Sequence, residues 1–466
     1  MFAAEVYSKR REELRKRVHS GLLLFLGNEE SPMNYRDNQY TFRQDSSFLY
    51  FWGLDHPGLA ALIDIEEGRE VLFGDNPTVA DIVWTGPQPL LEEKAGQVGI
   101  VMTESMNDLR EALMRAVRLG RTVHFLPPYR HENLLRLERL SGIHPGVVHE
   151  YASGEFITAV VAQRSIKTAE EIAEIESALE ISYEMQTMAM KASKPGVFER
   201  EVAGAMHGLA LARGGNIAFP IILSIHGETL HNHHYGNLMK AGDIVVNDSG
   251  AESALHYASD LTRTFPVSGK FSDRQKEVYS IVLNAQLKAV EAVKPGICFR
   301  DIHLLACTVL ATGLNELGLM KGDAKEAVRQ GAHALFFQCG LGHMMGLDVH
   351  DMEDLGEQFV GYEELQRSPQ FGLCYLRLAK ALRPGFVLTV EPGLYFIPQL
   401  IDRWKAEKTL EQFINYEAVE GYRDFGGVRI EDDVLVTESG HRLLGKPVPK
   451  AIGAIEEQCV RQGMSS

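Results

Sequence analysis

The chain has 466 residues, a length that allows two or three domains and a large hydrophobic core. Its 47 basic and 63 acidic residues give a net charge of −16, which argues against a nucleic-acid partner and an anionic membrane surface. The five cysteines form no C-x-x-C pair, so we interpret them as inert, small apolar side chains. The N-terminus lacks a signal-peptide pattern and no run of 18 apolar residues occurs, so we expect a cytoplasmic protein without a membrane span.

The first part of the chain mixes strand and helix patterns and predicts an α/β domain. A helical pattern covers residues 107–120 and ends at a glycine. Apolar and aromatic residues between turn residues predict four strands, at 21–27, 46–54, 59–65 and 69–74.

The second part of the chain repeats one set of helices. A capping box begins a long helix at Thr168, and a second capping box begins another at Ser272. Each helix runs to a Lys-Pro-Gly stop, and after each stop a further helix opens, at Arg200 in one case and Arg300 in the other. The matching order predicts an internal duplication.

Four acids occupy matching positions in the strands of this duplication. Asp248 in GDIVVNDSG aligns with Glu391 in GFVLTVEPG. Asp260 in YASDLTRTFPV aligns with Glu431 in VRIEDDVLVT. If the two halves face each other across a pseudo-twofold axis, the four carboxylates converge, and their mutual repulsion predicts two divalent cations between them.

The donor types suggest which metal binds. Carboxylate-rich sites with few nitrogen ligands favour Mn²⁺, with Fe²⁺, Co²⁺ and Zn²⁺ as alternatives. The segment GLGHMMGLDVHD adds His343 and His350 as candidate imidazoles, and the glycines beside His343 allow a close approach of the backbone. It is not a phosphate-binding loop, because the lysine and hydroxyl residue of that motif are missing.

These segments resemble the signature blocks of the M24 metallopeptidases, and most closely those of Xaa-Pro aminopeptidases (aminopeptidase P). The resembling blocks are DSGAE, YASDLTRTFPVSGKFS, GLGHMMGLDVHD, TVEPGLYF, GGVRIEDD and, nearer the N-terminus, DNQYTFRQDSSFLYFWGLDHP. The resemblance implies a two-domain α/β chain. An N-terminal creatinase/aminopeptidase P-type α/β domain would cover 1–165, and a C-terminal pita-bread α+β domain with the pseudo-twofold duplication would cover 166–466.

The resemblance also implies the ligand set and the reaction. Two metal ions would be held by Asp248, Asp260, His343, Glu391 and Glu431. Asp260 and Glu431 would bridge the ions, and a hydroxide between the metals would attack the scissile carbonyl. His350 would contact the substrate, and Arg429 would orient the acids through charge-assisted hydrogen bonds.

Further residues are implied around the substrate. A family histidine precedes the first metal-binding aspartate, and counting back from that position selects His231 as catalytic among His231, His233 and His234, with His234 as a substrate-binding candidate. Asp37 and Trp84 match family positions that close the pocket, across a subunit interface of a homodimer or homotetramer. Insertions after DVHD and at roughly 397–425 affect the substrate rim and not the metal ligands.

The implied function is a dinuclear metallo-aminopeptidase that hydrolyses the Xaa-Pro bond of peptides with proline at position two. That bond is a tertiary amide without an N–H, which peptidases that bind substrates as β-strands require. An Xaa-Pro dipeptidase (prolidase) shares the same metal ligands and stays open as the alternative. A catalytically inactive pita-bread protein that binds partners is the remote alternative, because all five ligands are present.

Overall fold

The computed structural model describes residues 1–460, which divide into two compact units. The first contains Met1–Arg164 together with Glu353–Phe359, and the second contains Ser165–Met352 and the chain from Val360 onward. Within residues 1–460, no helix combines the length and the apolar character that crossing a membrane requires.

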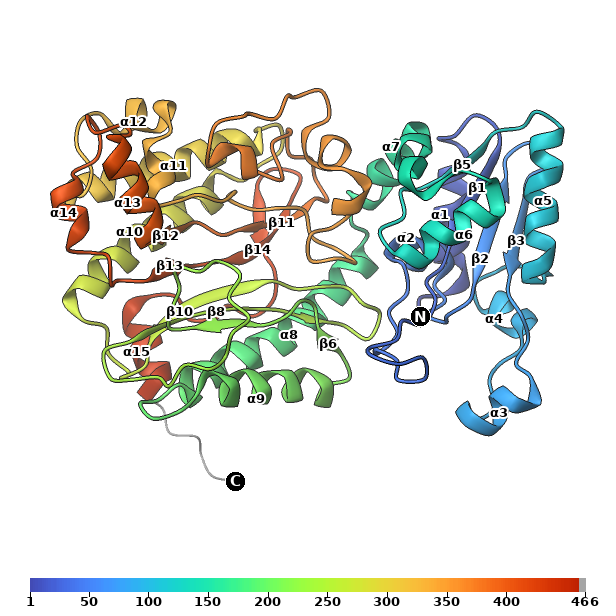
Figure 1. The fold of residues 1–466 in the computed structure, drawn as a ribbon, viewed down its shortest axis with the longest axis horizontal. Coiled ribbons are helices and arrows are strands. Elements are labelled where there is room, and N and C mark those ends of the chain that lie inside the picture. The colour runs from blue at the N-terminus through green and yellow to red at the C-terminus, as the bar shows by residue number, and fades with distance from the viewer. Residues whose placement is uncertain (461–466) are drawn as a thin grey trace. The chain divides into compact units, whose positions relative to one another are not determined.

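The first unit is built on a mixed five-stranded sheet with the strand order β4-β3-β2-β1-β5 (Figure 1). The β1, β2 and β3 strands pair antiparallel, whereas β5 joins β1 and β4 joins β3 in parallel. Its elements are α1 (Ala4–Arg15), β1 (Leu22–Leu26), α2 (Ser46–Trp52), β2 (Ala60–Asp64), β3 (Arg69–Phe73), α3 (Val79–Thr85), α4 (Leu91–Gln97), β4 (Met102–Glu104), α5 (Met106–Arg118), β5 (Val123–Phe125), α6 (His131–Ser141) and α7 (Gly154–Arg164).

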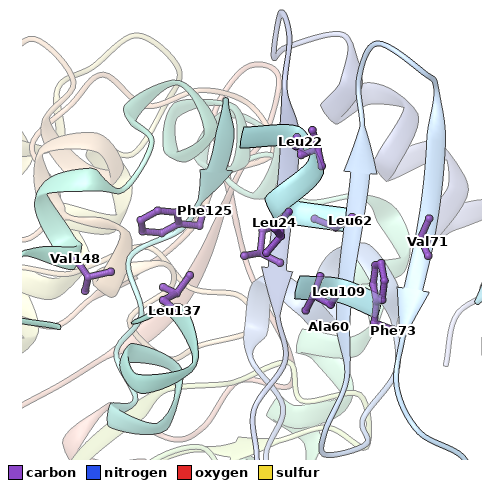
Figure 2. Close-up of a cluster of buried hydrophobic side chains, with 12 residues drawn as sticks. Leu22, Leu24, Ala60, Leu62, Val71, Phe73, Leu109, Phe125, Leu137 and Val148 are labelled. Carbon is purple, nitrogen blue, oxygen red and sulfur yellow. The ribbon is translucent and has the colours of Figure 1, made fainter. Parts of the chain in front are cut away.

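One face of this sheet carries a hydrophobic core (Figure 2). Alternate residues of a strand share a face, so Leu22 and Leu24 of β1 point to the same side. They meet Leu109 of α5 and Leu137 of α6, and all four are at most 4% exposed. Burial of each such side chain stabilises the unit by about 1.5–3 kcal/mol.

The segment 46–54 is the one predicted strand that is wrong, because residues Ser46–Trp52 form helix α2. Asp45 caps this helix by accepting a hydrogen bond from the Phe48 amide, and Gly53 ends it in the left-handed conformation at φ 63°. Every residue of α2 is buried, so its apolar run shows no alternation that would distinguish a strand from a buried helix. The other three predicted strands and the helix at 107–120 are confirmed as β1, β2, β3 and α5.

The second unit contains the two repeated halves, a pita-bread arrangement in which long helices pack on short sheets. One sheet has the order β10-β8-β7, and α8 packs on β8 and β10 (Figure 1). The other has the order β11-β14-β15, and α10 contacts β11. The predicted capping boxes are present, since Thr168 caps α8 and Ser272 caps α10.

The elements of the second unit follow in chain order. They are α8 (Ala169–Ala192), α9 (Glu199–Ala212), β6 (Asn216–Ile217), β7 (Ile222–Ser224), β8 (Ile244–Ser249), β9 (Ala251–Glu252), β10 (Leu261–Pro266), α10 (Asp273–Ala292), α11 (Phe299–Glu316), α12 (Ala324–Gln330), β11 (Val387–Val390), β12 (Gly393–Tyr395), α13 (Pro398–Glu407), α14 (Tyr416–Glu420), β13 (Gly427–Arg429), β14 (Asp432–Val436), β15 (His441–Leu443) and α15 (Ile452–Val460).

Candidate metal centre

Two antiparallel strand pairs, one from each half of the second unit, present the four predicted acids. In the first pair, β8 runs against β10 with Asp248 opposite Thr262, and Asp260 immediately precedes β10. In the second pair, β11 runs against β14, with Glu391 directly after β11 and Glu431 directly before β14. The Glu431 amide donates to the Thr262 carbonyl (3.1 Å), which connects the two halves beside the acids. The folded chain thus places matching positions of the duplication side by side.

Three of these acids, Asp248, Asp260 and Glu391, line a cavity of about 210 Å³ in the second unit. Its lining includes seven of the residues that the sequence selected, together with apolar side chains of the same unit. The selected lining residues are His231, Asp248, Asp260, His343, His350, Glu391 and Arg429. Glu431 is 1% exposed, and one of its carboxylate oxygens lies within 4.8 Å of ligand atoms of Asp260 and His343.

His343 is held in the tautomer that suits a metal ligand. Its Nδ1 lies 3.1 Å from the Met344 carbonyl, which can only accept a hydrogen bond, so the ring proton is on Nδ1. The Nε2 lone pair then points at carboxylates, 3.5 Å from Asp260 Oδ2 and 3.5 Å from Glu391 Oε1. Burial and the neighbouring His350 lower the pKa of His343 well below its usual value, so the imidazole is neutral.

The glycine before His343 permits this placement. The His343 amide donates to Thr389 Oγ1 (3.2 Å), and the Thr389 amide donates to the His343 carbonyl (3.0 Å). A Cβ on Gly342 would lie 2.0 Å from the Thr389 carbonyl oxygen, so a larger residue would push the segment away from β11. This confirms the expectation that glycine allows close backbone approach here.

The clustered carboxylates lack sufficient positive charge. Burial raises the pKa of Asp260 well above its usual value, and the charge of Glu431 adds to the shift. Burial, reinforced by Glu391 and Asp248, raises the pKa of Glu431 in the same direction. Burial raises the pKa of Glu391 to about 7. These shifts describe acids that would ionise fully only beside additional cations.

The hydrogen bonds of the acids leave one face of the cluster without partners. Thr262 Oγ1 donates to Glu431 Oε2 (2.6 Å), and Arg429 Nη2 donates to Asp248 Oδ2 (2.5 Å). The opposite oxygens, Asp248 Oδ1, Asp260 Oδ1 and Glu431 Oε1, are buried and have no hydrogen-bond partner among residues 1–460. Buried carboxylate oxygens without donors, next to a neutral imidazole nitrogen, form a donor set that fits divalent cations.

Arg429 supports the cluster from the side. Its guanidinium is 4% exposed and donates to Thr262 Oγ1 (3.2 Å), Tyr395 Oη (2.9 Å) and Asp248 Oδ2 (2.5 Å). The bonds to Thr262 and Tyr395 hold the guanidinium in place, and its third bond orients the Asp248 carboxylate through Oδ2. The orienting role that the sequence suggested for Arg429 therefore has a geometric basis.

The candidate histidines outside the ligand set differ in whether they line the cavity. His350 lies against His343, with ring centroids 4.3 Å apart, and it lines the cavity. His231 and His233 also line the cavity, whereas His234 is not among the lining residues. Partial desolvation and the charge of Arg429 lower the pKa of His231, so this imidazole is neutral at neutral pH.

The two candidates from the N-terminal part lie in the first unit. Asp37 is exposed, and Trp84 on helix α3 is 86% exposed. The cavity lining consists of residues of the second unit alone, so Asp37 and Trp84 are not part of it in this chain.

Sequence reasoning missed several lining residues. Tyr375 and Arg377 lie in the insertion after DVHD, where no motif identifies individual residues. Cys339 also lines the cavity, and burial together with the charge of Glu391 raises the pKa of its thiol to about 12. The GLGH spacing could have pointed to Cys339, which lies four residues before His343, whereas Arg377 could be found only from the fold.

Comparisons with known proteins agree with this geometry. The family model of metallopeptidase family M24 matches residues 173–438, and that of the aminopeptidase P N-terminal domain matches residues 7–124. The chain belongs to metallopeptidase family M24. The family model covers the whole cavity, including both acid-bearing strand pairs.

Named relatives of this M24 metallopeptidase fall into two groups. The chain is 32% identical to human Xaa-Pro dipeptidase over 96% of this chain and 90% of that protein. It is 29% identical to the Xaa-Pro aminopeptidase of Escherichia coli over 97% of this chain and 96% of that protein. A structure of zinc-substituted E. coli aminopeptidase P in complex with product matches with a TM-score of 0.80, 28% identity and 98% coverage of both chains.

Proposed function

We propose that the protein is a dinuclear Xaa-Pro metallopeptidase. The carrying observation is the cluster of buried carboxylates around the neutral His343. Its Nε2 lies 3.5 Å from Asp260 Oδ2 and 3.5 Å from Glu391 Oε1, and three other carboxylate oxygens of the cluster have no hydrogen-bond partner among residues 1–460. The five residues that would hold the ions are Asp248, Asp260, His343, Glu391 and Glu431, and Mn²⁺ is the metal that this oxygen-rich set favours. Bound there, the cations would supply Lewis acidity that activates water and polarises the scissile carbonyl.

The residues of this chain would bind and orient the substrate. The acids attract a protonated amino terminus, which places the first peptide bond at the centre of the cavity. His350 and His231 are positioned on the wall to form hydrogen bonds with a carbonyl oxygen as negative charge develops on it. Phe219, Pro220 and Val349 give the wall an apolar part that suits a proline ring. Nothing in this arrangement requires an N–H on the scissile amide.

We infer further that the preferred substrates are Xaa-Pro dipeptides. Arg377 brings positive charge to the cavity wall, close enough to affect the pKa values of His231, His343 and Glu391. A dipeptide carries its own carboxylate directly on the proline, and a guanidinium is a good bidentate partner for it. The cavity of about 210 Å³ is also smaller than the roughly 300–1,000 Å³ of drug-sized ligand sites, as expected for a short substrate.

The second candidate is an Xaa-Pro aminopeptidase that accepts longer peptides, as the sequence motifs suggested. It is supported by the match to the aminopeptidase P structure over 98% of both chains. The two activities share the metal ligands and differ in what lies beyond the proline, so the rim residues Tyr375 and Arg377 decide between them.

The experiment compares three substrates: Ala-Pro, its C-terminal amide, and Ala-Pro-Ala, each assayed with Mn²⁺. For a dipeptidase, we expect kcat/KM to be highest for Ala-Pro and at least about 100-fold lower for the amide, which removes about 3 kcal/mol of charge-assisted binding. In the Arg377→Ala variant, cleavage of Ala-Pro should fall by a similar factor and cleavage of the amide should not change. Equal cleavage of Ala-Pro-Ala and Ala-Pro would instead identify an aminopeptidase.

No cleavage of any Xaa-Pro substrate after Mn²⁺ addition would support the inactive binding protein.

Four predictions from the sequence remain predictions. They are manganese as the native metal, a homodimer or homotetramer, a cytoplasmic location, and a domain boundary between residues 165 and 166. Trp84 is the residue that we would change to test the oligomer. Its large aromatic side chain is exposed in the single chain, and a subunit interface would remove it from water. Light scattering of the wild type and of Trp84→Ser measures that state.

A further inference from the structure

A second cluster of metal-binding side chains lies in the second unit, outside the lining of the cavity. His303 and Cys307 are four residues apart on helix α11, so they share one face of the helix. His333 joins them from the 3₁₀ turn Ala332–Leu335. His303 and Cys307 are 0% exposed and His333 is 2% exposed. One potential ligand atom from each residue lies within 4.8 Å of the others.

The distances suit a shared tetrahedral ion. Cys307 Sγ lies 3.4 Å from His303 Nε2. A tetrahedral zinc with Zn–S of about 2.3 Å and Zn–N of about 2.0 Å separates the sulfur and nitrogen by about 3.5 Å. The rings of His303 and His333 are 6.4 Å apart at 71°, so they approach the cluster from different directions.

The hydrogen bonding of these residues is incomplete without a ligand. Neither ring nitrogen of His333 has a hydrogen-bond partner within the described part of the chain, and neither does His303 Nδ1. A neutral imidazole carries one N–H in either tautomer, so His333 buries at least one unpaired polar group, and each such group costs about 1–3 kcal/mol. Hydrophobic packing alone therefore does not explain why these imidazoles are buried.

We propose that His303, Cys307 and His333 form a second, structural binding site for a thiophilic divalent cation, Zn²⁺. Two imidazoles and a thiolate select zinc, whereas the carboxylates of the main centre favour harder ions. Burial lowers the pKa of His303 to about 3 and that of His333 to about 4, so both are neutral, as ligands must be. Binding would break the S–H bond of Cys307 and release its proton to solvent, and the sulfur would keep that electron pair and donate it to the metal.

A catalytic role for Cys307 does not fit. The side chain is completely buried, so no substrate reaches it, and burial raises the pKa of its thiol well above the usual value. A structural ion fits better, because it would join α11 to the segment 332–343. The end of this segment contains Gly340, Gly342 and His343, which line the main cavity. The bound ion would thus stabilise the fold near the metal centre without taking part in the reaction.

The test uses the full chain produced in Co²⁺-supplemented medium, with Co²⁺ as the probe. Asp260→Asn/Glu431→Gln serves as the background, since it removes two acids from the main centre and leaves the second cluster intact. We expect about one Co²⁺ per chain that absorbs in the near ultraviolet through thiolate-to-Co²⁺ charge transfer. Carboxylates and imidazoles do not give this band, so metal that remains in the main centre does not interfere.

Three further variants in that background assign the thiol. Cys307→Ser should lose both the band and about one equivalent of Co²⁺, and His333→Gln should weaken the binding of Co²⁺ at least about 10-fold. Cys339→Ser, which alters a cavity thiol, should keep the band. Circular dichroism confirms that each variant is folded. A missing band in the background protein, or a band that only Cys339→Ser removes, would overturn the proposal.

A stability measurement in the otherwise unmodified chain provides the second readout. After chelation, addition of Zn²⁺ should raise the melting temperature of the wild type more than that of Cys307→Ser, because a ligand of the folded state stabilises it. Equal shifts in the two proteins would also refute the site. Neither measurement uses peptidase activity, so failure of the proposed function and failure of this proposal are distinguishable.

Discussion

The buried ion pair between Lys167 and Asp351 provides a quantitative prediction. Lys167 Nζ lies 2.8 Å from Asp351 Oδ2, and both side chains are only 1% exposed. A Cβ on Gly346 would lie 2.6 Å from Asp351 Oδ2 and 2.9 Å from Lys167 Cε, so the pair is tightly enclosed. Asp351 follows His350, and the pair therefore holds the end of the segment that lines the metal centre.

Lys167→Met should lower the free energy of unfolding by about 3–5 kcal/mol, because it removes the ammonium group that lies against the buried Asp351 carboxylate. The double variant Lys167→Met/Asp351→Leu should recover to within about 1–2 kcal/mol of the wild type, since apolar side chains can replace a buried pair at little cost. Asp351→Leu alone should likewise cost about 3–5 kcal/mol, so the coupling energy between the two positions would be at least about 4 kcal/mol.

Urea unfolding followed by circular dichroism measures these free energies, and hydrogen exchange of 343–351 localises the change. Lys16→Met is the matched control, because Lys16 also lies 2.8 Å from a carboxylate, on Glu13, but both side chains are largely exposed, at 56% and 42%. It should cost less than about 1 kcal/mol. A Lys167→Met effect equal to that of the control, or additive single effects in the double variant, would refute the reasoning.

Three other outcomes follow from the geometry. Asp260→Asn and Glu431→Gln should each abolish peptidase activity and lower the Mn²⁺ content measured by elemental analysis, and unchanged metal content would contradict the ligand assignment. His350→Ala should slow turnover at least about 100-fold with metal retained, whereas loss of metal would show that His350 is a ligand. Burial lowers the pKa of His303 to about 3 and that of His333 to about 4, so metal-free protein should lose stability as the pH falls from about 6.5 toward 4, by up to about 1.4 kcal/mol per pH unit for each imidazole. The unfolded state binds protons that the folded state excludes, so His333→Gln should reduce this acid slope in urea titrations, and an unchanged slope would contradict it.

The sequence by itself predicted most of the second unit. Capping boxes at Thr168 and Ser272 are local signals, because the cap side chain bonds an amide three residues away, and both helices begin where expected. The matching positions of Asp248 and Glu391 followed from the duplication alone. The aromatic run at 46–52 was misinterpreted as a strand, because burial on all sides removes the periodicity that distinguishes the two structures.

Tertiary structure decided what no local pattern encodes. Arg377 reaches the cavity from an insertion without a motif. His333 becomes a candidate metal ligand only because the fold brings it to His303 and Cys307, and because its ring nitrogens have no hydrogen-bond partner among residues 1–460. Helices and strands can be predicted from the spacing of residues that are close in sequence, since each structure imposes a fixed repeat. Charge in a cavity and shared ligation depend instead on which distant segments the fold brings within a few ångströms, and that is set by packing of the whole chain.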